Sequence, residues 1–215
     1  MMKVEWQETN KGATPCHGAL FQKSEKPLTF GATPERNDGE FSAPINTGAA
    51  YRKRMKIICT PYTSDNKAQV TAIWNDIVRD ANAFPQEVPF TEEEGDAFFR
   101  SQTATAVAYA GEEIAGFYIL HDNNVGRCSH TANASYGVAK KFRGCGVGKV
   151  LVSDSLMKAK ECGYCGLQYN AVVKSNYGAI TLYLKLGFNI IGTVPNGYRR
   201  ADGTFEDLLI FHKSL

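Results

Sequence analysis

The sequence predicts an α/β (α+β) domain in which helices flank one central sheet, preceded by an irregular N-terminal extension. Strand-like apolar segments alternate with amphipathic helical segments from residue 56 onward. A glycine-rich turn joins a strand to a helix at residues 143–148. Before residue 56 the chain is rich in Gly, Pro, Thr, Ser and Asn and has little periodicity. We therefore expect an extension at 1–55 and a domain at 56–215.

The first half of the domain is predicted to contain five elements in the order strand, helix, helix, strand, strand. The second helix begins at Thr91, and Glu94 stands at capping-box spacing from it. A tight turn near Gly111 joins the two later strands. The five elements are expected at residues 56–63, 64–83, 91–102, 104–111 and 112–120.

The second half continues as strand, helix, strand, helix, strand, strand. The strand at 134–139 leads into the glycine-rich turn. The helix after the turn has apolar and small residues at three- and four-residue spacing, namely Val147, Val150, Leu151, Ser155 and Leu156. The later helix begins at Asn176, a good N-cap residue, and stops at Gly187.

The glycine-rich turn indicates a phosphate-binding site. Glycines leave backbone amides unshielded, and amides at a helix start favour an anion. A nucleotide P-loop does not fit, because three residues rather than four separate Gly144 from Gly148 and Val150 replaces the Ser or Thr. The dinucleotide fingerprint fails on glycine spacing as well. The pattern that fits is Arg-x-x-Gly-x-Gly, starting at Arg143, and its simplest ligand is a diphosphate.

This motif and a second block resemble the GNAT superfamily of coenzyme A-dependent N-acetyltransferases. The second block is Asn-x-x-Ala-x-x-x-Tyr followed by Gly-Phe, at Asn176 to Phe188. The resemblance implies a mixed, mostly antiparallel sheet with two splayed strands and acetyl-CoA as co-substrate. It implies that Tyr183 protonates the leaving thiolate and that the Val138 amide stabilises the oxyanion. The residues that it assigns to coenzyme binding are Val138, Ala139, Arg143, Gly144, Cys145, Gly146, Val147, Gly148 and Asn176.

A narrower likeness points to the acceptor. The run Arg-Cys-Ser-His-x-x-Asn-Ala at 127–134 is similar to the fungal proline-analogue (azetidine-2-carboxylate) acetyltransferases. In that branch two asparagines line the substrate pocket, and they correspond to Asn133, which we also count as catalytic, and Asn170. Each could instead satisfy a local bulge. The loop containing Phe84 usually shapes the acceptor pocket in this family. No Asp or Glu lies at 126–138, so the base is either His130 or a chain of water.

We therefore predict an enzyme that transfers acetyl from acetyl-CoA to a small-molecule amine, an amino acid or an analogue, by direct attack in a ternary complex. Two alternatives stay open. The acceptor could be a protein N-terminus or a lysine side chain, which a long groove with acidic walls would favour. The chain could also be a non-catalytic acyl-CoA-binding module, which would have no need of the proton donor Tyr183.

Composition excludes several other classes. With 24 basic and 22 acidic residues the formal charge is +2, which does not suggest a nucleic-acid-binding protein. No apolar run approaches the roughly 20 residues needed to cross a bilayer, and a signal-peptide core is missing, so we expect a cytoplasmic protein without a membrane partner. Cys162 and Cys165 lack a second pair for zinc, so no metal is predicted. A homodimer is expected from the resemblance only.

Overall fold

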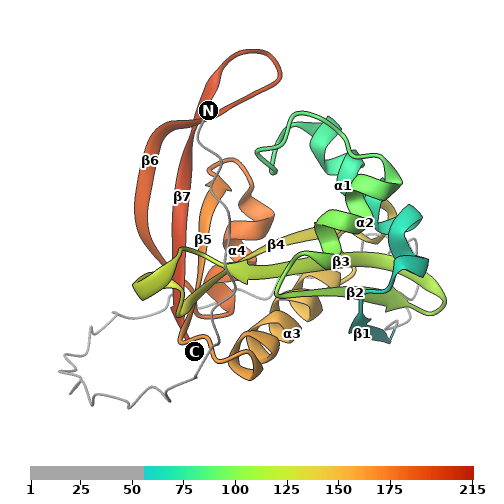
Figure 1. Cartoon of the computed structure of the whole chain (residues 1–215). Coiled ribbons are helices and arrows are strands. Elements are labelled where there is room, and N and C mark those ends of the chain that lie inside the picture. Colours follow the sequence, from blue (N-terminus) through green and yellow to red (C-terminus); the bar gives the residue numbers. More distant parts are fainter. Residues whose placement is uncertain (1–55) are drawn as a thin grey trace, which may run out of the picture. The chain divides into compact units, whose positions relative to one another are not determined.

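The structure, a computed structural model, describes residues 56–215 (Figure 1). The predicted extension at 1–55 lies outside the described residues, and its boundary with the domain stays a prediction. The strands are β1 Ile57–Pro61, β2 Ala104–Ala110, β3 Glu113–Asp122, β4 Thr131–Val138, β5 Gly166–Val173, β6 Asn189–Arg199 and β7 Phe205–Ser214. The helices are α1 Lys67–Asp80, α2 Glu92–Arg100, α3 Val147–Glu161 and α4 Tyr177–Lys185.

The seven strands form one sheet in the order β1-β2-β3-β4-β5-β7-β6. β4 and β5 pair in parallel, and every other neighbouring pair is antiparallel. The predicted mixed, mostly antiparallel sheet flanked by helices is therefore confirmed. None of the helices in residues 56–215 has the length and apolar character needed to cross a membrane.

The two faces of the sheet carry two separate apolar cores, as the alternation of side chains along a strand requires. On β2, Val107 packs with α1 and α2, whereas Ala106 and Ala108 pack with α3. On β3, Phe117 and Ile119 face the α1 side. In Figure 1, α1 and α2 lie above these strands and α3 lies below them. Near-continuous burial of β3 follows from this double coverage.

Element boundaries differ from the prediction at two places that matter for the site. The helix expected at 64–83 is a 3-10 turn at Ser64–Asn66 followed by α1, which stops where Ala81 adopts a left-handed conformation (φ 46°). The strand expected at 134–139 begins earlier, at Thr131. The earlier start places Asn133 inside β4, next to both neighbouring strands.

The parallel strands β4 and β5 separate soon after they meet. Their register covers three pairs, from Thr131 opposite Gly166 to Asn133 opposite Gln168. Beyond Asn133 the two strands diverge, while β4 stays paired with β3 as far as Val138. A bulge in β5 between Tyr169 and Val172 accompanies the divergence. The splayed strands expected from the resemblance are thus present.

Gly137 offers a stability test of this packing. It pairs with Phe117 across β3 and β4, and a Cβ at Gly137 would clash with the fully buried Phe117 ring. We expect Gly137→Ala to lower the free energy of unfolding by about 1–3 kcal/mol, the usual cost of overpacking. Urea denaturation measures this loss. Gly178→Ala in α4, where an added Cβ has room, should be neutral or slightly stabilising. A stable Gly137→Ala protein would show that the Phe117 ring has room to move.

Candidate active site

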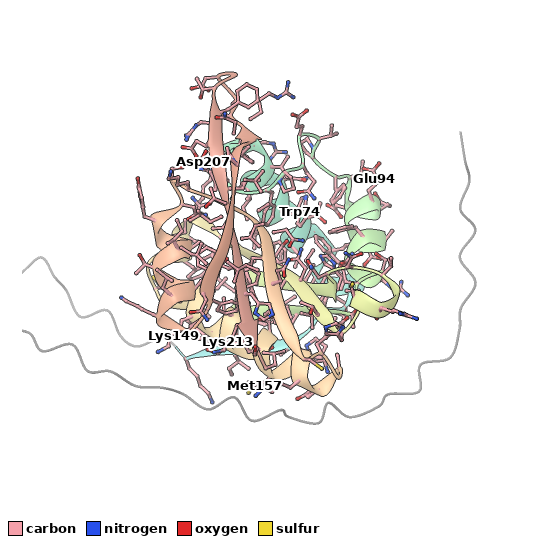
Figure 2. All side chains as sticks on the ribbon, turned by 90° about the vertical axis from the view of Figure 1, so that its left-hand side faces the viewer. Trp74, Glu94, Lys149, Met157, Asp207 and Lys213 are labelled. Carbon is pink, nitrogen blue, oxygen red and sulfur yellow. The ribbon has the colours of Figure 1, made fainter. Side chains whose placement is uncertain are left out.

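One cleft of about 1350 Å³ passes through the opening between β4 and β5. Its walls include Trp74 from α1, Asn133 and Val138 from β4, and Lys149 from α3. Figure 2 shows Trp74 and Lys149 well separated across the molecule, so the cleft is long. The cleft runs from the glycine-rich turn on the α3 side to the aromatic residues on the α1 side. Two molecules bound at its two ends could therefore meet inside it.

The glycine-rich turn presents free helix amides to this cleft. Gly146 is the N-cap of α3 and adopts φ 88°, a conformation that disfavours other residues. The first intrahelical bond of α3 runs from the Val150 amide to the Gly146 carbonyl at 3.3 Å. The amides of Val147, Gly148 and Lys149 precede this bond, so they have no acceptor within the helix. A Cβ at Gly146 would meet only open space, which leaves room for a ligand against the backbone.

Two cations beside the turn are held by one carboxylate at the end of α1. Asp80 lies 2.9 Å from the Lys140 ammonium and 3.3 Å from the Arg143 guanidinium. The hydrogen bond from Lys140 is the main reason that the pKa of Asp80 lies below its usual value. Arg143 lines the cleft, so Asp80 orients a positive group toward the place where phosphates are expected.

The Val138 amide points into the opening between the strands. In an antiparallel pair, successive amides of one strand point alternately to its two sides. The Ala139 amide donates to the Ala115 carbonyl of β3 at 3.0 Å. The Val138 amide therefore points away from β3, toward the side from which β5 has diverged.

A cluster of tyrosines fixes the position of Tyr183, whose ring lies 4.5 Å from that of Tyr169. The Ser155 hydroxyl donates to the Val152 carbonyl, so Tyr136 must donate to Ser155 (2.7 Å), and Tyr169 to Tyr136 (2.8 Å). The Tyr183 phenol has no hydrogen-bond partner within residues 56–215 and lines the cleft. Burial, helped by nearby Tyr136, raises the pKa of Tyr183 above its usual value, so this phenol stays protonated at neutral pH.

The two predicted asparagines both line the cleft but differ in their partners. Asn170 lies at the bulge of β5, where it donates to Asn123 at 2.6 Å and accepts from Gln168 at 2.8 Å. The Asn133 side chain makes no hydrogen bond with any residue in the described part of the chain. Asn133 is therefore the more available of the two to a ligand.

The cleft gathers most of the residues singled out in the sequence. Ala139 and Cys145 are not among its walls. The Ala139 amide donates to the Ala115 carbonyl at 3.0 Å, and the Ala139 carbonyl accepts from the Phe142 amide at 2.9 Å, so a ligand could use only the second lone pair of that carbonyl. The predicted site residues that do line the cleft are Phe84, Asn133, Val138, Arg143, Gly144, Gly146, Val147, Gly148, Asn170, Asn176 and Tyr183.

The histidine considered as a base in the sequence lies outside this cleft, and another histidine lines it. His130 is exposed, and its ring bonds the Arg127 carbonyl at 3.1 Å outside the cleft walls. His121 is a wall residue, and it pairs with Asn133 across β3 and β4. The signal that could have found it was the register of two strands, which one sequence does not give.

Two buried polar atoms near the α1 end of the cleft have no partner in the described residues: Trp74 Nε1 and Gln86 Oε1. Both residues are wall residues. Trp74 stands in an aromatic group, 4.6 Å from the ring of Phe84 and 5.1 Å from that of Phe98. The α1 end thus combines aromatic walls with unsatisfied hydrogen-bonding atoms.

Comparisons with known proteins agree with this geometry. Residues 70–188 match the acetyltransferase (GNAT) family. The N-acetyltransferase aca1 of Schizosaccharomyces pombe is 26% identical over 133 residues, which cover 54% of this chain and 64% of that protein. The matched region thus spans less than two thirds of this curated relative.

Solved structures show the same fold. A GCN5-related N-acetyltransferase from Kribbella flavida is 27% identical, with a TM-score of 0.70 and coverage of 74% of this chain and 98% of that one. A phosphinothricin acetyltransferase from Sinorhizobium meliloti, solved with acetyl-CoA, also has a TM-score of 0.70, at 20% identity and with coverage of 75% and 89%. The family match extends over more than half of the chain and takes in both the glycine-rich turn and Tyr183. This chain therefore belongs to the acetyltransferase (GNAT) family.

Proposed function

We propose that the chain is an acetyl-CoA-dependent N-acetyltransferase that acetylates the amine of a small molecule, an amino acid or a close analogue. The observation that carries the proposal is the single cleft that joins the α3 amides to Asn133 and Tyr183 through the opening between β4 and β5. Acetyl-CoA would supply an activated acyl group as a thioester.

The coenzyme end of the cleft suits a diphosphate. The amides of Val147, Gly148 and Lys149 and the dipole of α3 favour negative charge. Arg143 and Lys149 add two positive side chains to the same walls. These residues would hold the pyrophosphate of coenzyme A, and the open space at Gly146 is consistent with its size.

Two groups at the centre of the cleft suit acyl transfer. The Val138 amide points into the gap, where it could donate to a carbonyl oxygen that gains negative charge. Tyr183 has a protonated phenol and could give its proton to a departing thiolate. The described wall residues include no cysteine that could form an acyl-enzyme, so these two groups would serve direct attack of the amine in a ternary complex.

The walls of the cleft give no support to a cationic acceptor. Among the described residues that line the cleft there is no Asp or Glu, Arg143 and Lys149 belong to the coenzyme end, and Arg200 is paired with Glu206 at 2.5 Å. The acidic groove that a lysine side chain or a basic peptide would favour is not found along these walls. The unpartnered Trp74 Nε1 and Gln86 Oε1 favour a polar acceptor over a purely apolar amine.

Asn133 is the asparagine expected to contact the acceptor directly, because its amide has no other partner among residues 56–215. We expect Asn133→Ala to raise the acceptor KM about tenfold, the value of one hydrogen bond of about 1.4 kcal/mol. Steady-state kinetics with varied acceptor measures this change. Asn189→Ala, at the exposed start of β6, serves as the control. If neither KM nor kcat moves in the Asn133 variant, this residue does not contact the acceptor.

The proposed function is tested by an acceptor screen of amino acids, amines and a lysine-containing peptide, following thiol release from acetyl-CoA. We expect release with at least one amino acid and little with the peptide. Acetyl-CoA binding without thiol release for any acceptor would favour a non-catalytic binding module. Preference for the peptide would favour a protein acetyltransferase.

A further inference from the structure

His121 stands at the acceptor side of the cleft, beside the asparagine just described. It belongs to β3, it lines the cleft, and its register partner on β4 is Asn133. Directly paired residues on antiparallel strands project on the same face of a sheet, so the imidazole and the Asn133 amide are neighbours there. On β3 and β4 the same face carries Ile119 and Ser135, which line the cleft as well.

A hydrogen bond fixes which nitrogen of His121 carries the proton. Nδ1 lies 2.9 Å from the backbone carbonyl oxygen of Asp122. A carbonyl oxygen only accepts, so Nδ1 must donate, and in the neutral ring Nε2 is left with a lone pair. This is the tautomer that a proton acceptor needs.

The other wall residues do not offer a better base. Along the cleft walls of the described chain there is no carboxylate, and Arg143, Lys149 and Arg200 are cations. Burial raises the pKa values of Tyr136, Tyr169 and Tyr183, so these phenols stay protonated at neutral pH and cannot take up a proton.

Acetylation nevertheless requires a proton acceptor, because an amino acid nitrogen is an ammonium at neutral pH and has no lone pair for attack. We propose that His121 is the general base of this site, an inference that rests on the proposed N-acetyltransferase function. An N–H bond of the acceptor ammonium breaks, an Nε2–H bond forms, and His121 becomes an imidazolium. The freed electron pair of the amine then attacks the thioester carbonyl and forms the C–N bond. As the C–S bond breaks, the thiolate takes the proton of Tyr183, and the second proton lost from the nitrogen restores the Tyr183 phenol. The imidazolium returns its proton to solvent.

The neighbours of His121 determine which other groups could change protonation when activity is measured against pH. Asn133 from β4 and Gln102, after α2, are neutral wall residues on this side. The carboxylate of the adjacent Asp122 accepts a hydrogen bond from Tyr164 at 2.5 Å. The charged wall residues of the described chain are Arg143, Lys149 and Arg200.

The test compares His121→Gln with His130→Gln across pH, using kcat/KM for the acceptor identified in the screen. Glutamine retains a polar side chain but cannot take up a proton, and His130 is an exposed histidine outside the cleft. At pH 7 we expect His121→Gln to lower kcat/KM about 100-fold or more, as for other general bases. The loss should shrink as pH rises toward the pKa of the acceptor amine, because solution then removes the proton. His130→Gln should follow the wild-type profile.

The inference is overturned if His121→Gln stays within threefold of wild type at pH 7, or if its loss is the same at every pH, as a merely structural role would produce. Nitrogen-15 NMR of the imidazole gives a readout without turnover: we expect Nδ1 protonated in the neutral ring, and a proton on Nε2 would contradict the proposal. Wild-type protein without any acetyl transfer would refute the proposed function itself. Normal transfer by His121→Gln would refute the base alone.

Discussion

Replacing Tyr183 with phenylalanine should lower kcat about 100-fold or more and leave the affinity for acetyl-CoA within about twofold. The variant loses one hydroxyl and keeps the ring that packs against Tyr169, Phe188 and Phe211. In the wild-type protein the phenol of Tyr183 is protonated because burial raises its pKa. It can therefore supply a proton to the leaving thiolate, which needs that proton only as the thioester bond breaks. An effect on kcat rather than on binding is the expected signature of such a group.

Single-turnover kinetics measures the rate of acetyl transfer in the Tyr183→Phe variant, and titration calorimetry measures its affinity for acetyl-CoA. Tyr177→Phe is the matched control, since Tyr177 opens the same helix and is 74% exposed. It should behave as wild type in both measurements. An unaltered turnover number in Tyr183→Phe would remove the acid role, and an equal loss of affinity would instead assign the hydroxyl to coenzyme binding.

Gly146→Leu is expected to weaken acetyl-CoA binding by roughly tenfold to 100-fold, which corresponds to about 1.4–2.8 kcal/mol. A side chain at this position would occupy the open space against the free amides of α3 and would keep the phosphates away from them. The left-handed backbone at Gly146 adds a strain of about 1–2 kcal/mol for a residue with a Cβ.

Gly163→Leu separates the strain from the loss of the site. Gly163 follows the opposite end of α3, has a similar φ of 84° and has equally open surroundings. Both variants should lose similar free energy of unfolding, and Gly146→Leu alone should lose affinity in calorimetry. Equal affinities in the two proteins would place the coenzyme phosphates away from this turn.

The sequence is most informative where a local signal fixes local structure. Gly146 and Asn176 mark the starts of α3 and α4 through their conformational and capping preferences, and the structure has Asn176 accepting from the Ala179 amide at 3.2 Å. The near-continuous burial of β3 from Ile114 to Leu120 likewise matches its apolar sequence. Fold class, the order of elements along the chain and the glycine-rich turn before α3 were therefore accessible without coordinates.

Features that depend on which strands pair, and in which register, were not accessible. His121 became a wall residue through its pairing with Asn133, although its neighbours in sequence carry no sign of it. Ala139 seemed to continue the coenzyme-binding edge, but its backbone groups bond to Ala115 and Phe142. The partners of Asn170 come from Asn123 and Gln168. The contacts of His121 with Asn133, of Ala139 with Ala115 and of Asn170 with Asn123 join residues far apart in the sequence, and a single sequence specifies such contacts only through the complete fold.

The short register between β4 and β5 lowers the stability of the sheet, and the remaining strand pairs must compensate for this loss. A sheet gains stability by closing its ladder of backbone hydrogen bonds, and here the ladder stops after Asn133 and Gln168. Substitutions that extended the pairing between β4 and β5 would be expected to raise the stability of the protein. They would also engage the Val138 amide in a hydrogen bond with β5, so that it could no longer donate to a ligand. Stability and the proposed chemistry therefore make opposite demands on this pair of strands, because the proposed active site uses hydrogen-bonding groups that the interrupted ladder leaves free.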